Sequence, residues 1–84
     1  MNKIIKPLST SVDINSSAST VSDSVLVSVL NTTNAVEEII VSGSGYNVKI
    51  GAGERLIIEK ATTDQLDATG ATGAIWAIAV AYRD

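Results

Sequence analysis

The sequence contains no cysteine and no histidine, and this absence excludes several classes of function. Without cysteine, the chain cannot form a disulfide framework. Without both residues, it cannot build a conventional zinc site or a nucleophilic centre that pairs cysteine or serine with histidine. No spacing in the sequence places a serine beside a lysine in a concave site either. The residues therefore predict no catalytic centre, no resident metal and no cofactor.

Positive charge is also scarce, with six Lys and Arg residues against nine Asp and Glu and a net charge of −3. Proteins that bind nucleic acid neutralise phosphates with clustered cations. Here the cations are scattered singly, so we expect no direct nucleic-acid partner. They are Lys3, Lys6, Lys49, Arg55, Lys60 and Arg83.

Long apolar runs are missing as well. The longest, residues 74–82, is too short to cross roughly 30 Å of hydrocarbon as a helix. Polar residues follow Lys3 and Lys6 where a signal peptide would need a continuous apolar stretch. We therefore expect a soluble, unprocessed chain with no membrane partner.

Aromatic side chains make up only 4% of the sequence. A sugar-binding groove normally presents several exposed rings, and the chain offers only Tyr46, Trp76 and Tyr82. The low aromatic share argues against a glycan site, and we expect Trp76 to belong to the core.

Glycine is clustered at residues 42–45 and 51–53, where it could be mistaken for phosphate-binding loops. Neither cluster opens a helix. Neither is followed by the Lys-Ser/Thr pair of a Walker loop or by the third glycine of a dinucleotide motif. Hairpin turns explain both clusters better, because glycine adopts a positive φ without a steric penalty.

Apolar residues recur with a two-residue period through most of the chain, which is typical of strands. With glycine and asparagine between them, these segments predict an all-β fold, a small antiparallel β-sandwich of about six or seven strands. Residues 24–84 form the domain. At most one short helical turn is expected, over residues 61–68, with Leu66 pointing inward. The predicted strands span residues 24–31, 36–41, 46–50, 54–60 and 74–82.

Residues 1–23 differ from the rest because they are rich in serine and threonine and contain the only proline, Pro7. We expect extended chain here, since these side chains compete with regular backbone hydrogen bonding. Two interpretations stay open: a first strand paired with the domain's own sheet, or an arm laid across a neighbouring subunit. The apolar residues of this segment are Ile4, Ile5, Leu8, Val12 and Ile14.

The last predicted strand has one face of large residues and one of small residues. We expect the large face, which includes Trp76, to fill the core. The small face lies either beneath another part of the same domain or against another subunit. Its candidate contact residues are Ala77, Ala79 and Ala81.

Acidic and basic residues in the strands suggest surface roles. Glu37 and Glu38 are adjacent and point to opposite faces, so we expect solvated charges and no shared proton. Charges at both ends of residues 54–60 suggest gatekeepers against edge-to-edge aggregation. Asp64 and Asp67 could meet across a helical turn around a calcium ion, but the ligand spacing of an EF-hand is missing.

The C-terminal part resembles small virion proteins of tailed bacteriophages, in particular cyanophages. In those proteins a strand that opens with AGE leads through a Lys-x-x-Thr-Asp-x-Leu turn to a final strand ending near VAY. Here the matching residues are 52–54, 60–66 and 80–82, and the resemblance covers roughly residues 25–82.

The resemblance implies a non-enzymatic virion protein of the capsid cement or decoration type. Its expected partner is the major capsid protein or another virion protein, and its location the virion, assembled in the host cytoplasm. A homo-oligomer is also expected, with a trimer suggested by three-fold sites of an icosahedral lattice. Two alternatives stay open: a minor component of the neck, tail or fibre, and a soluble ligand- or glycan-binding module.

Overall fold

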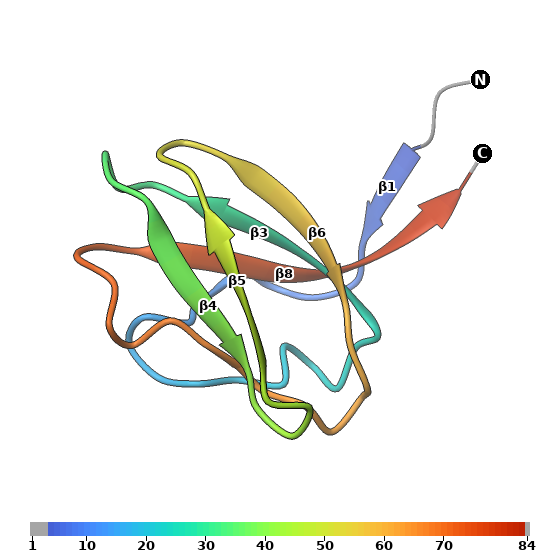
Figure 1. Cartoon of the computed structure of the whole chain (residues 1–84). Coiled ribbons are helices and arrows are strands. Elements are labelled where there is room, and N and C mark those ends of the chain that lie inside the picture. The colour runs from blue at the N-terminus through green and yellow to red at the C-terminus, as the bar shows by residue number, and fades with distance from the viewer. Residues whose placement is uncertain (1–3, 84) are drawn as a thin grey trace.

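The computed structural model describes residues 4–83, which form an all-β fold of eight strands without a helix. Two antiparallel sheets pack on each other as a small β-sandwich, as the sequence predicted (Figure 1). The described residues contain no helix that could cross a membrane. The strands are β1 (Ile4–Pro7), β2 (Val12–Asp13), β3 (Leu26–Asn31), β4 (Glu37–Val41), β5 (Tyr46–Ile50), β6 (Arg55–Glu59), β7 (Leu66–Asp67) and β8 (Ile75–Arg83).

The larger sheet has five strands and is organised around β8. β3 pairs with one side of β8, and β6 pairs with the far side of β3. β1 and β2 both pair with the other side of β8, one near each end. β5, β4 and β7 form the second, three-stranded sheet. The two sheets enclose one apolar core between them.

The N-terminal segment runs along β8 of its own chain. β1 pairs with the end of β8 and β2 with its beginning. Between them, the backbone N–H of Leu8 donates to the Ala79 carbonyl at 2.7 Å. The N–H of Ala79 donates to the Ser9 hydroxyl at 3.1 Å, so a side chain replaces a missing backbone acceptor. Of the two interpretations, the structure describes the strand within the domain's own sheet.

The structure reverses the expected orientation of β8. Its small face, including Ala77 and Ala79, lies in the core, while Trp76 is 42% exposed on the opposite side. The prediction that Trp76 belongs to the core is therefore wrong. The space above β8 is already filled by large side chains from the other sheet, such as Ile39 and Leu66, so only small residues fit beneath them.

Residues 61–68 contain a single turn and then β7. The N–H of Asp64 donates to the Ala61 carbonyl at 3.0 Å, which closes the turn. Leu66 is fully buried, as predicted, but it is held by a bridge to Ser19 and by pairing with Val41 of β4. The short helical turn does not form here because the chain joins the three-stranded sheet immediately.

Asn31 ties the end of β3 to the connection between β5 and β6. Its side chain is fully buried. The amide Nδ2 donates to the carbonyls of Ala35, Ile50 and Gly51 at 2.9, 3.2 and 3.0 Å. The Oδ1 accepts the N–H of Thr33 at 2.8 Å. A single side chain thereby satisfies polar groups that the sandwich would otherwise bury unpaired.

Candidate functional site

The outward-pointing side of the five-stranded sheet combines apolar side chains with a few polar and charged ones, and we call it the outer face. Residues directly opposite each other in antiparallel strands point to the same side. Ser28 of β3 lies between Ile57 of β6 and Ile78 of β8, and in the next row Leu30 lies between Arg55 and Trp76. The outer face comprises Pro7, Asp13, Leu26, Ser28, Leu30, Arg55, Ile57, Glu59, Trp76, Ile78 and Val80.

This surface is accessible in the single chain. Trp76 is 42% exposed, and Leu30, Ile57 and Ile78 are half-buried. Ser28 is buried, and its hydroxyl accepts a hydrogen bond from the Arg55 guanidinium at 2.7 Å. Val80 is only 3% exposed, so the accessible part of the outer face is the part around Trp76. An exposed apolar patch that includes a tryptophan is typical of a surface that binds another macromolecule.

The sequence-predicted contact residues are divided between the core, the surface and an edge. Ile14, Ala77 and Ala79 are buried in the chain's own core, so they offer no surface to a partner. Of the two interpretations of the alanine face, the structure describes the one in which Ala77 and Ala79 lie beneath another part of the same domain, and it corrects the one in which they contact another subunit. Val12 packs partly against the core and Leu8 is 53% exposed.

The remaining three residues lie where β1 pairs with β8. Ala81 is half-buried opposite Lys6. The backbones of Ile4 and Ile5 pair with Arg83 and Tyr82, while the side chains of Ile4 and Ile5 lie outside the described part of the chain. The eight predicted residues therefore do not form one surface.

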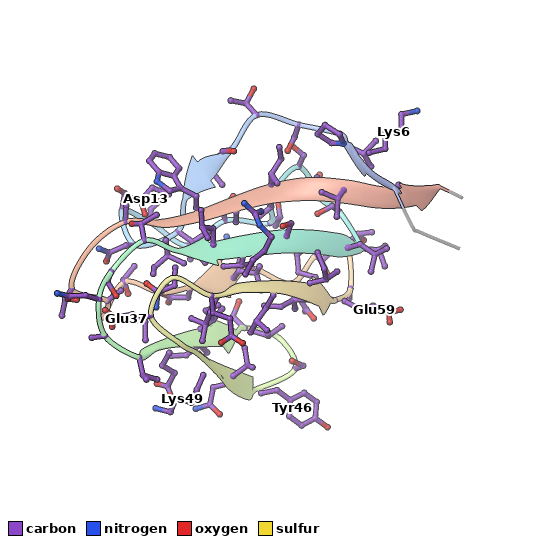
Figure 2. All side chains as sticks on the ribbon, turned by 90° about the horizontal axis from the view of Figure 1, so that it is seen from above. Lys6, Asp13, Glu37, Tyr46, Lys49 and Glu59 are labelled. Atoms are coloured by element: carbon purple, nitrogen blue, oxygen red, sulfur yellow. The ribbon has the colours of Figure 1, made fainter. Side chains whose placement is uncertain are left out.

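The three-stranded sheet carries a second candidate site, a shallow hollow of about 250 Å³. It is lined in part by Glu37, Lys49 and Asp67. Figure 2 shows Lys49 and Tyr46 on this side of the molecule, away from Lys6 and Asp13. The charges of the hollow are engaged in local contacts, as shown by the 3.4 Å ion pair between Lys49 and Glu38.

Glu37 is not the solvated charge that the sequence predicted. It is only 7% exposed, because it points to the same side of β4 as Ile39. Its Oε2 accepts hydrogen bonds from the hydroxyls of Thr33 and Thr72 at 2.9 and 2.6 Å. These donors replace water, and they hold the pKa of Glu37 below its usual range, with the Thr72 hydroxyl as the largest cause.

Asp67 is likewise held by its neighbours. Its Oδ1 accepts the backbone N–H and the hydroxyl of Thr69 at 2.9 and 2.8 Å, which lowers its pKa. Asp64 instead lies against Gly43. No helical turn brings Asp64 and Asp67 together, and the described residues contain no cluster of three or more possible metal ligands.

Stability in acid should depend on the hydroxyl groups around Glu37. A carboxyl whose pKa is lower in the folded chain stabilises the fold above its unfolded pKa and loses this effect as pH falls through the folded value. We therefore expect the thermal midpoint to fall as pH drops below 4.5, the ordinary pKa of this carboxyl. Thr72→Val should lower the midpoint at neutral pH, and the difference from the native protein should shrink in acid.

The matched control is Thr62→Val, because Thr62 is exposed. Its midpoint should follow the native curve at every pH. If the curves of Thr72→Val and the native protein ran parallel into acid, the stabilising role of the Glu37 carboxylate would be disproved.

Lys60 also departs from its predicted surface role. It is buried, and its Nζ donates to the carbonyls of Ser24 and Ala61 at 2.7 and 3.2 Å. Burial lowers its pKa, while Asp64 and Asp23 act in the opposite direction. Among the charged residues expected to prevent edge pairing of β6, Arg55 and Glu59 are exposed. Lys60 instead links the backbone at Ser24 to that at Ala61.

Comparison of the chain with protein-family models, curated proteins and solved structures found no match. The case for a function therefore depends on the geometry of the outer face. In the sequence, this surface corresponds to one of the two apolar sides predicted for the segments that form β3 and β8. The sequence could not show which of the two sides the second sheet would cover.

Proposed function

We propose that this protein is a non-enzymatic virion structural protein of the capsid cement type, which docks through its outer face onto a lattice of major capsid protein. The observation that carries the proposal is the accessible apolar surface around Trp76 on a domain whose core is complete without it. The sequence resemblance to small virion proteins supplies the class of partner.

A repeated lattice is a suitable partner for a surface of this kind. Burial of apolar area contributes about 25 cal/mol per Å², and association itself costs several kcal/mol. A small outer face therefore gives only modest affinity for one site. When neighbouring contacts already hold a subunit in place, each further contact forms at a high effective concentration, and total binding becomes strong.

The two aromatic residues whose exposure the structure describes do not favour a glycan-binding module. Trp76 belongs to the five-stranded sheet, and Tyr46, which is 75% exposed, belongs to β5 of the other sheet. The described structure therefore does not gather these two rings into one platform of the kind that sugar rings stack on. A position in the neck, tail or fibre would use the same outer face but would require tens of copies instead of hundreds.

The test is the amount of this chain in purified virions, measured by gel densitometry against the major capsid protein. We expect stoichiometric presence and lower heat tolerance of particles that lack it. Trp76→Lys should reduce particle occupancy at least about tenfold, because central aromatic residues often dominate binding energy. Tyr46→Lys, the same change on the other sheet, should leave occupancy unchanged.

Two results would contradict the proposal. One is a chain absent from virions. The other is equal loss of occupancy in both variants, which would show that the outer face has no special part in docking.

A further inference from the structure

β6 ends the five-stranded sheet with an open edge. No strand of the described chain pairs with its outer side. The N–H of Lys60 donates to the Val25 carbonyl at 2.8 Å, and the carbonyl of Glu54 accepts the N–H of Asn31 at 3.0 Å. Alternate residues of a strand direct their backbone groups to opposite sides. The even-numbered residues therefore face β3, and the backbone groups of the odd-numbered residues, 55, 57 and 59, point outward.

We propose that two copies of this chain pair antiparallel along β6, around a two-fold axis at Ile57. In this register the two Ile57 residues exchange backbone hydrogen bonds. Arg55 of one copy then lies opposite Glu59 of the partner subunit, and the symmetry repeats the pair. Both residues are exposed, and Figure 2 shows Glu59 at the end of this strand. Opposite charges in facing positions stabilise a strand pair.

The apolar residues of β6 support the same register. Leu56, Ile57 and Ile58 are all half-buried in the single chain. Leu56 and Ile58 pack against the core from the open edge. Pairing places Leu56 opposite Ile58 of the partner subunit on the inner side, and Ile57 opposite its own copy on the outer face. The dimer thus extends the core and doubles the width of the outer face.

The charge pattern also limits the alternatives. A parallel pair would place Arg55 opposite Arg55 of the partner subunit, which is unfavourable. The Arg55 guanidinium already donates to Ser28, but it has five N–H donors and can bind a carboxylate as well. The charges expected to prevent edge pairing therefore select one arrangement, in which all outward backbone groups of β6 are used.

The edges at β1 and β5 are less suited to self-pairing. The β1 edge contains Pro7, which has no N–H, and the row of strands is interrupted between β1 and β2. β5 contains Asn47 and Lys49, and pairing of β5 with itself would bring no opposite charges together. A two-fold pair uses the β6 edge of both copies and leaves no β6 edge free for a third. This favours a dimer over fibres and over the trimer expected from lattice geometry.

Charge reversal tests the dimer with the purified full chain. Sedimentation equilibrium should give a mass approaching twice 8.7 kDa as concentration rises. Glu59→Arg and Arg55→Glu should each raise the dissociation constant at least about tenfold, because both symmetric pairs become like-charged. The double variant, with the two charges exchanged, should return to within about threefold of the native value. Lys6→Glu, the same change of charge as Arg55→Glu at the opposite edge of the sheet, is the control.

Amide hydrogen exchange locates the contact. Protection of the amides of residues 55, 57 and 59 should rise with protein concentration, while that of residues 56 and 58 should stay constant. Arg55→Glu removes the hydrogen-bond partner of Ser28 and could prevent folding. In that case Glu59→Arg and the exchange pattern would still test the dimer. A native monomer at millimolar concentration, a trimer, or single and double variants with equal dissociation constants would each overturn the inference. These measurements need no particle, so their outcome is separate from that of virion docking.

Discussion

Replacing Asn31 with aspartate should lower the free energy of unfolding by about 3 kcal/mol or more. The native amide donates to three carbonyl oxygens within a fully buried site. Aspartate has the same shape but places acceptors, and a negative charge, against those oxygens. A buried polar group that loses its partner costs about 1–3 kcal/mol, and a charged one costs more. Since a domain of this size has a stability near the lower end of about 5–15 kcal/mol, more than half could be lost.

Urea unfolding, followed by tryptophan fluorescence, measures this effect. Protein concentration is kept fixed, because any association adds a concentration-dependent contribution to stability. The matched control is Asn34→Asp, the same chemical change at an exposed position three residues away, which should alter stability by no more than about 0.5 kcal/mol. Equal unfolding midpoints for the two variants would show that the Asn31 network does not hold the fold together.

The position of most strands could be predicted from the sequence, because local chemistry determines it. Alternating apolar residues and the glycine turns predicted strands at residues 24–31 and 46–50, and the structure has Leu26–Asn31 and Tyr46–Ile50. Gly53, with a φ of +69°, does form the turn before β6. These features depend on side chains a few residues apart, so the sequence contains them directly.

The orientation of β8 could not be predicted in the same way. Its two sides alternate with equal regularity, so periodicity does not say which side faces inward. Size suggested that Trp76 faces the core. The outcome depended instead on the large residues that the second sheet places above β8, such as Ile39 and Ile50. That information is held in other segments of the chain and appears only when the sheets pack.

The sequence analysis also did not identify the polar residues that hold the fold together through buried hydrogen bonds. Asn31 and Glu37 resemble ordinary polar positions near a turn, and only the folded chain shows that distant carbonyls and hydroxyls surround them. Residues 21–23 all have positive φ values, although none of them is glycine. Val21 is nevertheless buried, so core packing holds this turn in a conformation that local preference disfavours.

The candidate surfaces follow the same division. The charge symmetry of residues 55–59, with arginine at one end and glutamate at the other, is visible in the sequence. Two further facts were not visible: that β6 lies at an open edge, and that its odd-numbered backbone groups point outward. Sheet order decides both. In a small β-sandwich, the sequence therefore predicts the chemistry of an interaction surface, whereas its location requires the structure.

Replacing Ala79 with leucine tests the reversed orientation of β8. Ala79 is 1% exposed and is flanked by Val27 on β3, so the added atoms must enter a packed core. Overpacking of this kind typically costs 1–3 kcal/mol, and we expect about 3 kcal/mol because the pairing of β8 on both sides leaves the backbone little freedom to shift. If the alanine side were instead a subunit contact, the same substitution would leave the stability of the single chain nearly unchanged.

The control makes the same substitution at Ala35, which is exposed in the connection before β4. Ala35→Leu should change stability by no more than about 0.5 kcal/mol. Urea unfolding of both variants at low protein concentration separates the two orientations, because dilution removes any contribution from association. A small effect of Ala79→Leu would contradict the packing of the two sheets, and the outer face around Trp76 would lose its basis as the free surface of the molecule.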